Sequence, residues 1–137
     1  MSRTRRISAV SLAIALMTLN GCAMISPSSG YCVPRVHVEP TTVRAGDTVT
    51  VVSEDRCEVT VPTGGWLVVA GHVGDGGNGP VQVRSTEPFD GSFRVDLQLP
   101  KDFPVGESYA GVINWDYSTC PDTASCAGPM GGFTVNR

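Results

Sequence analysis

The sequence predicts an all-β domain, an antiparallel β-sandwich of about seven strands. The 137 residues include 16 Gly and 10 Pro, which favours a chain with many turns. Residues 91–99 are apolar at every second position, as in a strand with one buried face. No window of ten residues in the domain has apolar residues at a convincing helical spacing. Short strands between Gly/Pro turns over about 105 residues are typical of one sandwich domain, residues 31–137.

Strands are expected between turn signals along the whole domain. The expected strands are residues 33–39, 47–53, 57–61, 65–73, 81–85, 91–99, 107–115 and 131–135. Residues 65–73 are apolar at successive positions, as in a central strand that is buried on both faces. Residues 40–46 and 74–80 are expected to be connections, and the glycines of 74–80 predict a hairpin tip.

The first 21 residues differ from the rest of the chain and predict a cleaved, helical signal peptide. Arg3, Arg5 and Arg6 give a positive start without a nearby acidic residue. Residues 7–19 form an apolar run of 13 residues, shorter than the roughly 20 that a membrane-spanning helix needs. This combination is typical of a secretory signal. The Arg5-Arg6 pair leaves the twin-arginine export route open beside the unfolded-chain route.

The end of this leader, Leu19-Asn20-Gly21-Cys22, resembles the lipobox of bacterial lipoproteins. In that family the cysteine receives a diacylglyceryl group and acyl chains such as palmitate, and it becomes the first mature residue. Asn20 departs from the small or hydroxylated residue usual at its position. The resemblance implies that Cys22 is lipidated on the extracytoplasmic side of the cell membrane, and that residues 22–30 are a linker. The nine Arg against one Lys favour a GC-rich genome, such as that of an actinobacterium.

The charge of the mature chain limits its partners. Removing the leader takes away three arginines and no acidic residue, so the net charge changes from −3 to −6. An acidic surface repels phosphate backbones and anionic lipid headgroups, so we expect no nucleic-acid partner. The lipid on Cys22, and not a basic patch, is therefore expected to hold the protein to the membrane.

The four remaining cysteines, Cys32, Cys57, Cys120 and Cys126, predict two disulfides. An even number in a small exported domain is typical of oxidised pairs, and no CxxC or HxxxH spacing indicates a metal site. Three pairings are possible. Cys32 precedes the first expected strand and Cys57 follows the second, so an antiparallel hairpin brings the two to the same end. Cys120 and Cys126 share one loop. Strand order therefore favours Cys32–Cys57 and Cys120–Cys126.

Two parts of the domain resemble bacterial immunoglobulin-like domains. Residues 36–51 (VHVEPTTVRAGDTVTV) are similar to the opening hairpin of these domains. Residues 91–93, the turn at Pro100 and residues 106–109 look like a later part of the same pattern. The resemblance covers about 100 residues and implies an immunoglobulin-like β-sandwich.

The resemblance also implies roles for three aromatic residues. Trp66 and Trp115 are expected in the core, and Tyr109 as a corner tyrosine whose hydroxyl bonds to nearby backbone. Gly111 stands where antibody-type domains have their second cysteine, so the likeness is to the architecture and not to that subfamily.

The most distinctive surface feature is the loop 118–129 (STCPDTASCAGP), which the Cys120–Cys126 bridge would close. A closed loop loses less entropy when it binds a partner. Pro121, Asp122 and Thr123 are therefore candidate recognition residues. Two alternatives stay open: the bridge only keeps a long loop from fraying, or the loop is presented to a protease as an inhibitor.

Catalytic, metal and cofactor sites are not indicated. His37 lies between two valines and is expected to point to solvent, and His72 lies three residues before Asp75, which on a strand is the opposite face. Residues 75–79 supply one carboxylate and one amide, fewer oxygens than calcium needs. No GxSxG motif or Ser-His-Asp arrangement can be proposed from position. We expect no metal, no cofactor and no catalytic residue.

Together these features predict a membrane-anchored cell-envelope lipoprotein with a non-catalytic binding or structural role near the membrane. The start of the first strand and both disulfide-bearing loops are expected at one end, which would face the membrane. A membrane-proximal protein or envelope component is the expected partner. A small envelope enzyme and a protease inhibitor acting through the Cys120–Cys126 loop remain alternatives.

Overall fold

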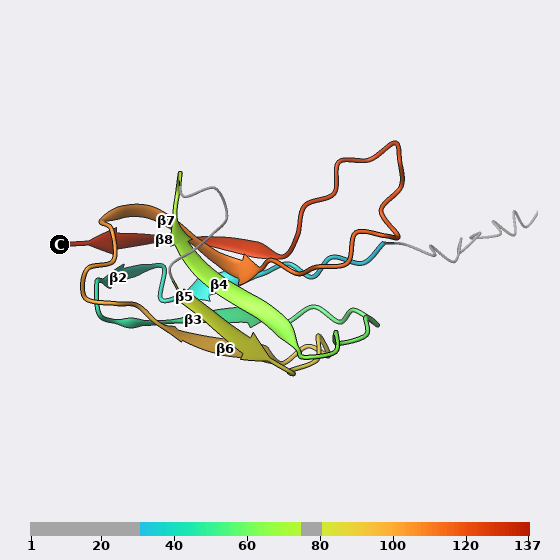
Figure 1. Ribbon diagram of the computed structural model, residues 1–137, viewed down its shortest axis with the longest axis horizontal. Helices are drawn as coiled ribbons and strands as arrows, with labels where there is room; N and C mark the ends of the chain where they lie inside the picture. The colour runs from blue at the N-terminus through green and yellow to red at the C-terminus, as the bar shows by residue number, and fades with distance from the viewer. Residues whose placement is uncertain (1–30, 75–80) are drawn as a thin grey trace, which may run out of the picture.

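The computed structural model describes residues 31–74 and 81–137, and the regular structure in this part of the chain is all β-strand (Figure 1). The predicted signal peptide, the linker and the lipidation site Cys22 lie outside the described residues, as does the hairpin tip from residue 75 to 80.

Residues 31–74 and 81–137 contain eight strands in two sheets. The strands are β1 (His37–Glu39), β2 (Thr42–Arg44), β3 (Thr48–Ser53), β4 (Trp66–His72), β5 (Val81–Ser85), β6 (Phe93–Gln98), β7 (Gly106–Val112) and β8 (Met130–Asn136). One sheet has the order β1-β3-β6, and the other has the order β2-β8-β7-β4-β5. Both sheets contribute their inner faces to one hydrophobic core.

β2 corrects the prediction that residues 40–46 are only a connection and that the sheets are purely antiparallel. It pairs in parallel with β8, with Val43 opposite Val135. Val43 is buried while its neighbours are exposed, so even three residues show the alternation of a strand. The segment was missed because it lies between Pro40 and Gly46, which are turn signals in the sequence.

The prediction of a strand at residues 57–61 is also wrong. The structure has no strand there, and the neighbouring Arg56 makes only an isolated β-bridge with Asp90. Beyond it, the Cys57 amide donates to the Phe89 carbonyl at 2.8 Å. The first strand is shorter than predicted. Pro34 has no N–H to give to a ladder, and the Arg35 amide donates to the Asp55 carboxylate instead. β1 therefore begins only at His37.

Aromatic side chains form one part of the core, as predicted for Trp66 and Trp115. Their rings stack with centroids 5.3 Å apart, and Phe89 meets both rings edge-on. Phe89 also stacks on Phe93 at 4.1 Å. The Trp66 indole N–H donates to the Glu87 carbonyl at 3.1 Å, so its polar atom is satisfied within the core.

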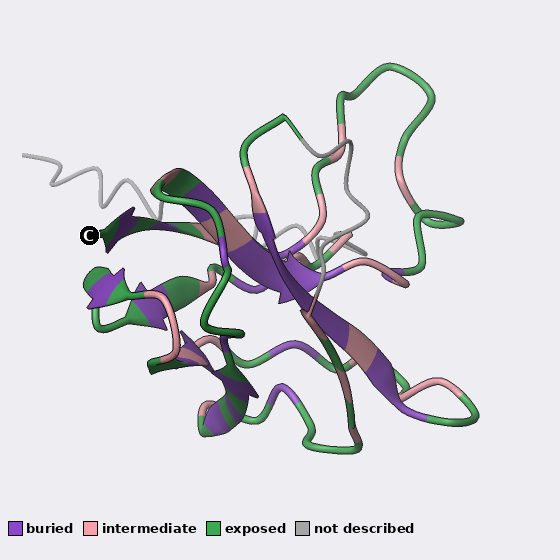
Figure 2. Cartoon of the chain, turned by 60° about the vertical axis from the view of Figure 1, so that its left-hand side comes forward, coloured by how far each residue is buried: buried purple, intermediate pink, exposed green. Residues whose placement is uncertain are grey.

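Burial along the strands follows the expected patterns (Figure 2). β6 alternates between buried and exposed residues over its whole length. In β4, Val68 and Val69 point to opposite faces and both have 0% exposure, which confirms a central strand buried on both sides. Val69 lies on the outer face of its sheet and is not part of the shared core.

The two disulfides pair as predicted, Cys32 with Cys57 and Cys120 with Cys126. Figure 1 shows the segment that begins at residue 31 and the loop that carries Cys120 and Cys126 at the same end of the domain. The connection between β6 and β7 lies at the opposite end.

The two bridges are expected to differ in their contribution to stability. They close segments with sequence separations of 25 and 6 residues. On the chain-entropy model, removing the longer one (Cys32→Ala with Cys57→Ala) lowers the free energy of unfolding by about 3.5 kcal/mol, and removing the shorter one by about 2.4 kcal/mol. Denaturant unfolding of the two double variants measures this order. A larger loss from the Cys120 and Cys126 variant would contradict it.

Candidate functional site

The strongest candidate site is a groove between the N-terminal segment, residues 31–36, and the disulfide loop, residues 118–129. Residues 31, 33–36, 121 and 124–130 line a space of about 530 Å³, here called the N-terminal groove. The two segments are far apart in sequence, and they meet because β1 and β8 begin at the same end of the domain. The groove is therefore built where the chain enters the domain.

The lining of the N-terminal groove is mainly apolar. Tyr31, Val33 and Val36 line it from one side, and Pro129 and Met130 from the other. Met130 is 40% exposed, so a large apolar side chain is accessible on this wall. Of the described residues that line the groove, Arg35 alone carries a charge. A surface of this kind suits an apolar partner with few charged groups.

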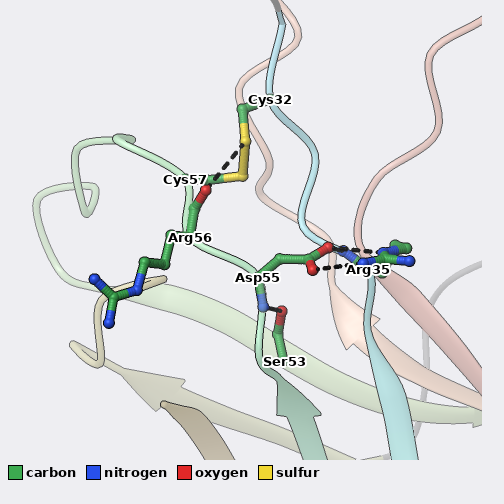
Figure 3. Close-up of polar contacts among 6 residues, drawn as sticks. All are labelled: Cys32, Arg35, Ser53, Asp55, Arg56 and Cys57. Carbon is green, nitrogen blue, oxygen red and sulfur yellow. Dashed lines mark hydrogen bonds and ion pairs between the residues drawn. A yellow bond between two sulfur atoms is a disulfide. The ribbon is translucent and has the colours of Figure 1, made fainter. Parts of the chain in front are cut away.

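The N-terminal segment is held to the loop after β3 by a covalent bond and an ion pair (Figure 3). The Arg35 guanidinium donates from Nη2 to Asp55 Oδ1 at 2.9 Å and from Nε to Asp55 Oδ2 at 3.0 Å. The Arg35 amide donates to the same Oδ2 at 2.8 Å. Three donors on one carboxylate, close to the Cys32–Cys57 bond, fix this wall of the groove.

Arg35 also changes the acidity of its partner. Hydrogen bonds from its guanidinium and amide lower the pKa of Asp55 from its usual 3.8 to about 2, while the same contact raises the pKa of Arg35. Both groups are thus charged throughout the neutral range. Neither Arg35 nor Asp55 was singled out from the sequence. The only signal is their place, three residues after Cys32 and two before Cys57.

The Asp55 contact predicts a dependence of stability on pH. Because the folded pKa lies below the unfolded one, the carboxylate contributes stability above pH 3.8, and the contribution is lost as the pH falls toward 2. We expect Asp55→Asn to melt below the wild type at neutral pH, and the gap to close between these two values. Thermal melts across the pH range check this. A gap that stays constant down to pH 2 would show that the charge of Asp55 is not responsible.

The disulfide loop is folded into tight turns. The Cys120 amide donates to the Tyr117 carbonyl and the Ala124 amide to the Pro121 carbonyl, each at 2.9 Å. The second bond makes residues 121–124 a β-turn. Pro121, Asp122 and Thr123 are all exposed, but only Pro121 lines the groove. Asp122 and Thr123 occupy the centre of the turn and are not among the lining residues.

Glycines allow the loop to return closely to the sheet. A Cβ atom on Gly128 would lie 2.5 Å from the Tyr117 hydroxyl. A Cβ on Gly111 would collide with the Pro129 carbonyl and lie 2.7 Å from the Met130 Cα. Gly111 therefore has a packing role at the base of the loop that the sequence comparison with antibody-type domains did not reveal.

Comparison with protein-family models, with curated proteins and with solved structures gives no match to this chain. No helix within residues 31–74 and 81–137 is long and apolar enough to cross a membrane. The function is therefore argued from the geometry of the domain itself.

The two histidines, His37 and His72, lie on different sheets. His37 is exposed on the three-stranded sheet, as expected, and its Nε2 lies 3.2 Å from Glu39 Oε1. Arg94 also donates to Glu39, at 3.1 Å, and these two contacts lower the pKa of Glu39. His72 lies on β4 in the other sheet. Within the described part of the chain, no three His, Cys, Asp or Glu side chains gather closely enough to hold a metal ion.

The corner-tyrosine expectation for Tyr109 is wrong. The Tyr109 hydroxyl is buried but has no hydrogen-bond partner, so it does not bond to nearby backbone. Tyr109 sits in the middle of β7, opposite Gly71 on β4 and Gly132 on β8. Its neighbours Ser108 and Ala110 are buried toward the core, so the alternation along β7 puts the Tyr109 side chain on the outer face of the sheet.

Proposed function

We propose that this protein is a lipid-anchored cell-envelope protein whose single immunoglobulin-like β-sandwich binds a membrane-proximal partner through the N-terminal groove. The observation that carries the proposal is that the chain segment nearest the proposed anchor forms one wall of that groove. In this proposal the domain is non-catalytic, and the lipid on Cys22 holds it on the extracytoplasmic side of the cell membrane.

The strand order supports the immunoglobulin-like assignment. In such domains one sheet holds strands A, B and E, and the other holds G, F and C, with C′ added in some of them. Here the order β1-β3-β6 corresponds to A-B-E, and β8-β7-β4-β5 corresponds to G-F-C-C′. β2 then takes the place of a first strand that divides between the two sheets.

The length of the linker supports a partner close to the membrane. The eight residues from 23 to 30 reach at most about 28 Å when fully extended. The Cys32–Cys57 bond and the Arg35–Asp55 pair then fix the chain to the domain immediately after the linker. The end of the domain that carries the N-terminal groove would therefore face the membrane.

The conformation of the disulfide loop favours this function over protease inhibition. A protease holds an inhibitory segment in an extended form, whereas residues 121–124 are closed into a β-turn by the bond from Ala124 to Pro121. The small envelope enzyme has no supporting observation in the described residues, because His37 and His72 lie on different sheets.

Lipidation is tested by the change Cys22→Ala. We expect the wild type to incorporate an alkyne-tagged palmitate and to sediment with membranes, since several buried acyl chains give stable anchoring. Cys22→Ala should take up no label and should leave the membrane fraction. A wild-type chain that carries no label would contradict the lipid anchor and leave the groove to be tested separately.

Partner binding is tested by Ala127→Arg, which places a charged side chain in the N-terminal groove. Val105→Arg is the matched control, because exposed Val105 lies in the β6–β7 connection at the opposite end. We expect cross-linking in native membranes to capture a stoichiometric partner with the wild type and the control, but not with Ala127→Arg.

Adding about twenty Gly/Ser residues to the linker, a further reach of about 25 Å, should weaken this capture. Equal capture by the longer-linker form would contradict the membrane-proximal position, and equal capture by Ala127→Arg would contradict the groove.

A further inference from the structure

A second hollow lies on the outer face of the five-stranded sheet, over β7 and β8. It has a volume of about 560 Å³ and is here called the sheet groove. The buried Phe133 and Ser108 contribute only backbone to its floor, because their side chains point into the protein. Val73 and Met130 border it and are 53% and 40% exposed. Two exposed apolar side chains thus stand at the ends of one hollow.

The register of β7 and β8 arranges the outward side chains in a row. Glu107 lies opposite Thr134, Tyr109 lies opposite Gly132, and Gly111 lies opposite Met130. The sheet groove therefore has a carboxylate and a hydroxyl at one end. An aromatic residue beside a glycine lies in the middle, and the thioether of Met130 is at the other end. Exposed Val73 also lies at the carboxylate end, because its amide donates to the Glu107 carbonyl at 2.9 Å, so the polar side chains stand at one end and apolar side chains at both.

The backbone conformation at position 132 does not require a glycine. Gly132 is not among the glycines with positive φ, and a Cβ atom there would meet, among the described residues, only the Ser108 carbonyl at 3.9 Å. Its neighbours differ, because a Cβ on Gly131 would lie 3.0 Å from the His37 Cα, and one on Gly111 would collide with the Pro129 carbonyl.

The ring of Tyr109 does not fill the space over Gly132, since no atom of Tyr109 lies within 4 Å of that Cβ position. Glycine inside a strand weakens the strand and often marks a bulge, a bend, or a place where a ligand or another backbone segment approaches. Among the described residues, the position over Gly132 is therefore open, and next to the aromatic residue it forms a slot in the floor of the sheet groove.

The charge of the lining narrows the class of ligand. Glu107 is the one charged side chain among the described residues of the sheet groove, so an anion would be repelled. An ionised carboxylate only accepts hydrogen bonds, while the hydroxyl of Thr134 both donates and accepts. A purely apolar ligand would leave Glu107 and Thr134 without partners. The lining therefore suits a ligand with hydrogen-bond donors, such as hydroxyl groups, at one end and an apolar face beside Tyr109.

We propose that the sheet groove binds a neutral saccharide. A pyranose ring has hydroxyl groups around its edge, which Glu107 and Thr134 are placed to bind. It also has C–H groups on its face, which fit against the Tyr109 ring in the slot over Gly132. Few polar groups on a mainly apolar surface are the usual composition of a small-molecule site. This site goes beyond the proposed partner groove and does not depend on lipidation. The two grooves share Met130.

The test uses the whole chain in detergent on an array of immobilised neutral glycans. The Kd of each bound glycan is then measured in solution by an NMR titration, which also gives the chemical-shift changes of the backbone amides. Gly132→Val fills the slot with a side chain that suits a strand, and Thr48→Val is the matched control on the exposed face of the other sheet. We expect wild type and Thr48→Val to bind the same glycans with a Kd of about 1 mM or below, with shifts on β7 and β8.

Gly132→Val is expected to raise the Kd at least about tenfold without lowering the melting temperature. Glu107→Gln should raise the Kd less, because the amide oxygen still accepts hydrogen bonds.

Absence of neutral glycan binding would overturn the proposal, as would binding that Gly132→Val leaves unchanged. Tighter binding of cadaverine than of any glycan, with loss on Glu107→Gln, would assign the groove to a cation instead. Partner capture through the N-terminal groove should be the same for Gly132→Val, so the two proposals fail separately.

Discussion

The bond between Cys32 and Cys57 joins the first described residues of the chain to the loop that follows β3. Residues 31–36 have no strand partner, and the disulfide adds a covalent tie to the packing of Tyr31 and Val36 against the core. Arg35 and Asp55 add a charged contact beside the disulfide. One wall of the N-terminal groove depends on this attachment, while β1 is also held by its ladder with β3.

The core explains why two of the strands, β1 and β2, can be so short. β1 and β2 have three residues each, and each contributes one buried valine, Val38 and Val43. Such strands are too short to be stable alone, and they persist because their valines complete a core that the longer strands have already formed. The same core holds an aromatic cluster of Trp66 from β4, Phe89 from the β5–β6 connection and Trp115 from the β7–β8 connection. Both connections are thereby anchored to the core.

Both candidate sites lie beside β8. The N-terminal groove lies where this strand begins, and the sheet groove lies over its outer face. Glycines at 111 and 131 let neighbouring chain segments approach closely, while the glycine at 132 leaves space open among the described residues. The same residue type thus serves packing at two positions and surface shape at a third, and only the surrounding atoms distinguish these roles.

The sequence by itself determined the β class, the central strand β4, the alternation of β6 and the pairing of the four domain cysteines, because each rests on local periodicity or on spacing along the chain. Tertiary structure alone decided the parallel pairing of β2 with β8, the loss of the strand expected at 57–61 and the buried, unbonded hydroxyl of Tyr109. It also brought Arg35 to Asp55 and residues 31–36 to the disulfide loop. These contacts join residues distant in sequence, and the chemistry of either partner alone does not specify which distant residue the fold will place beside it.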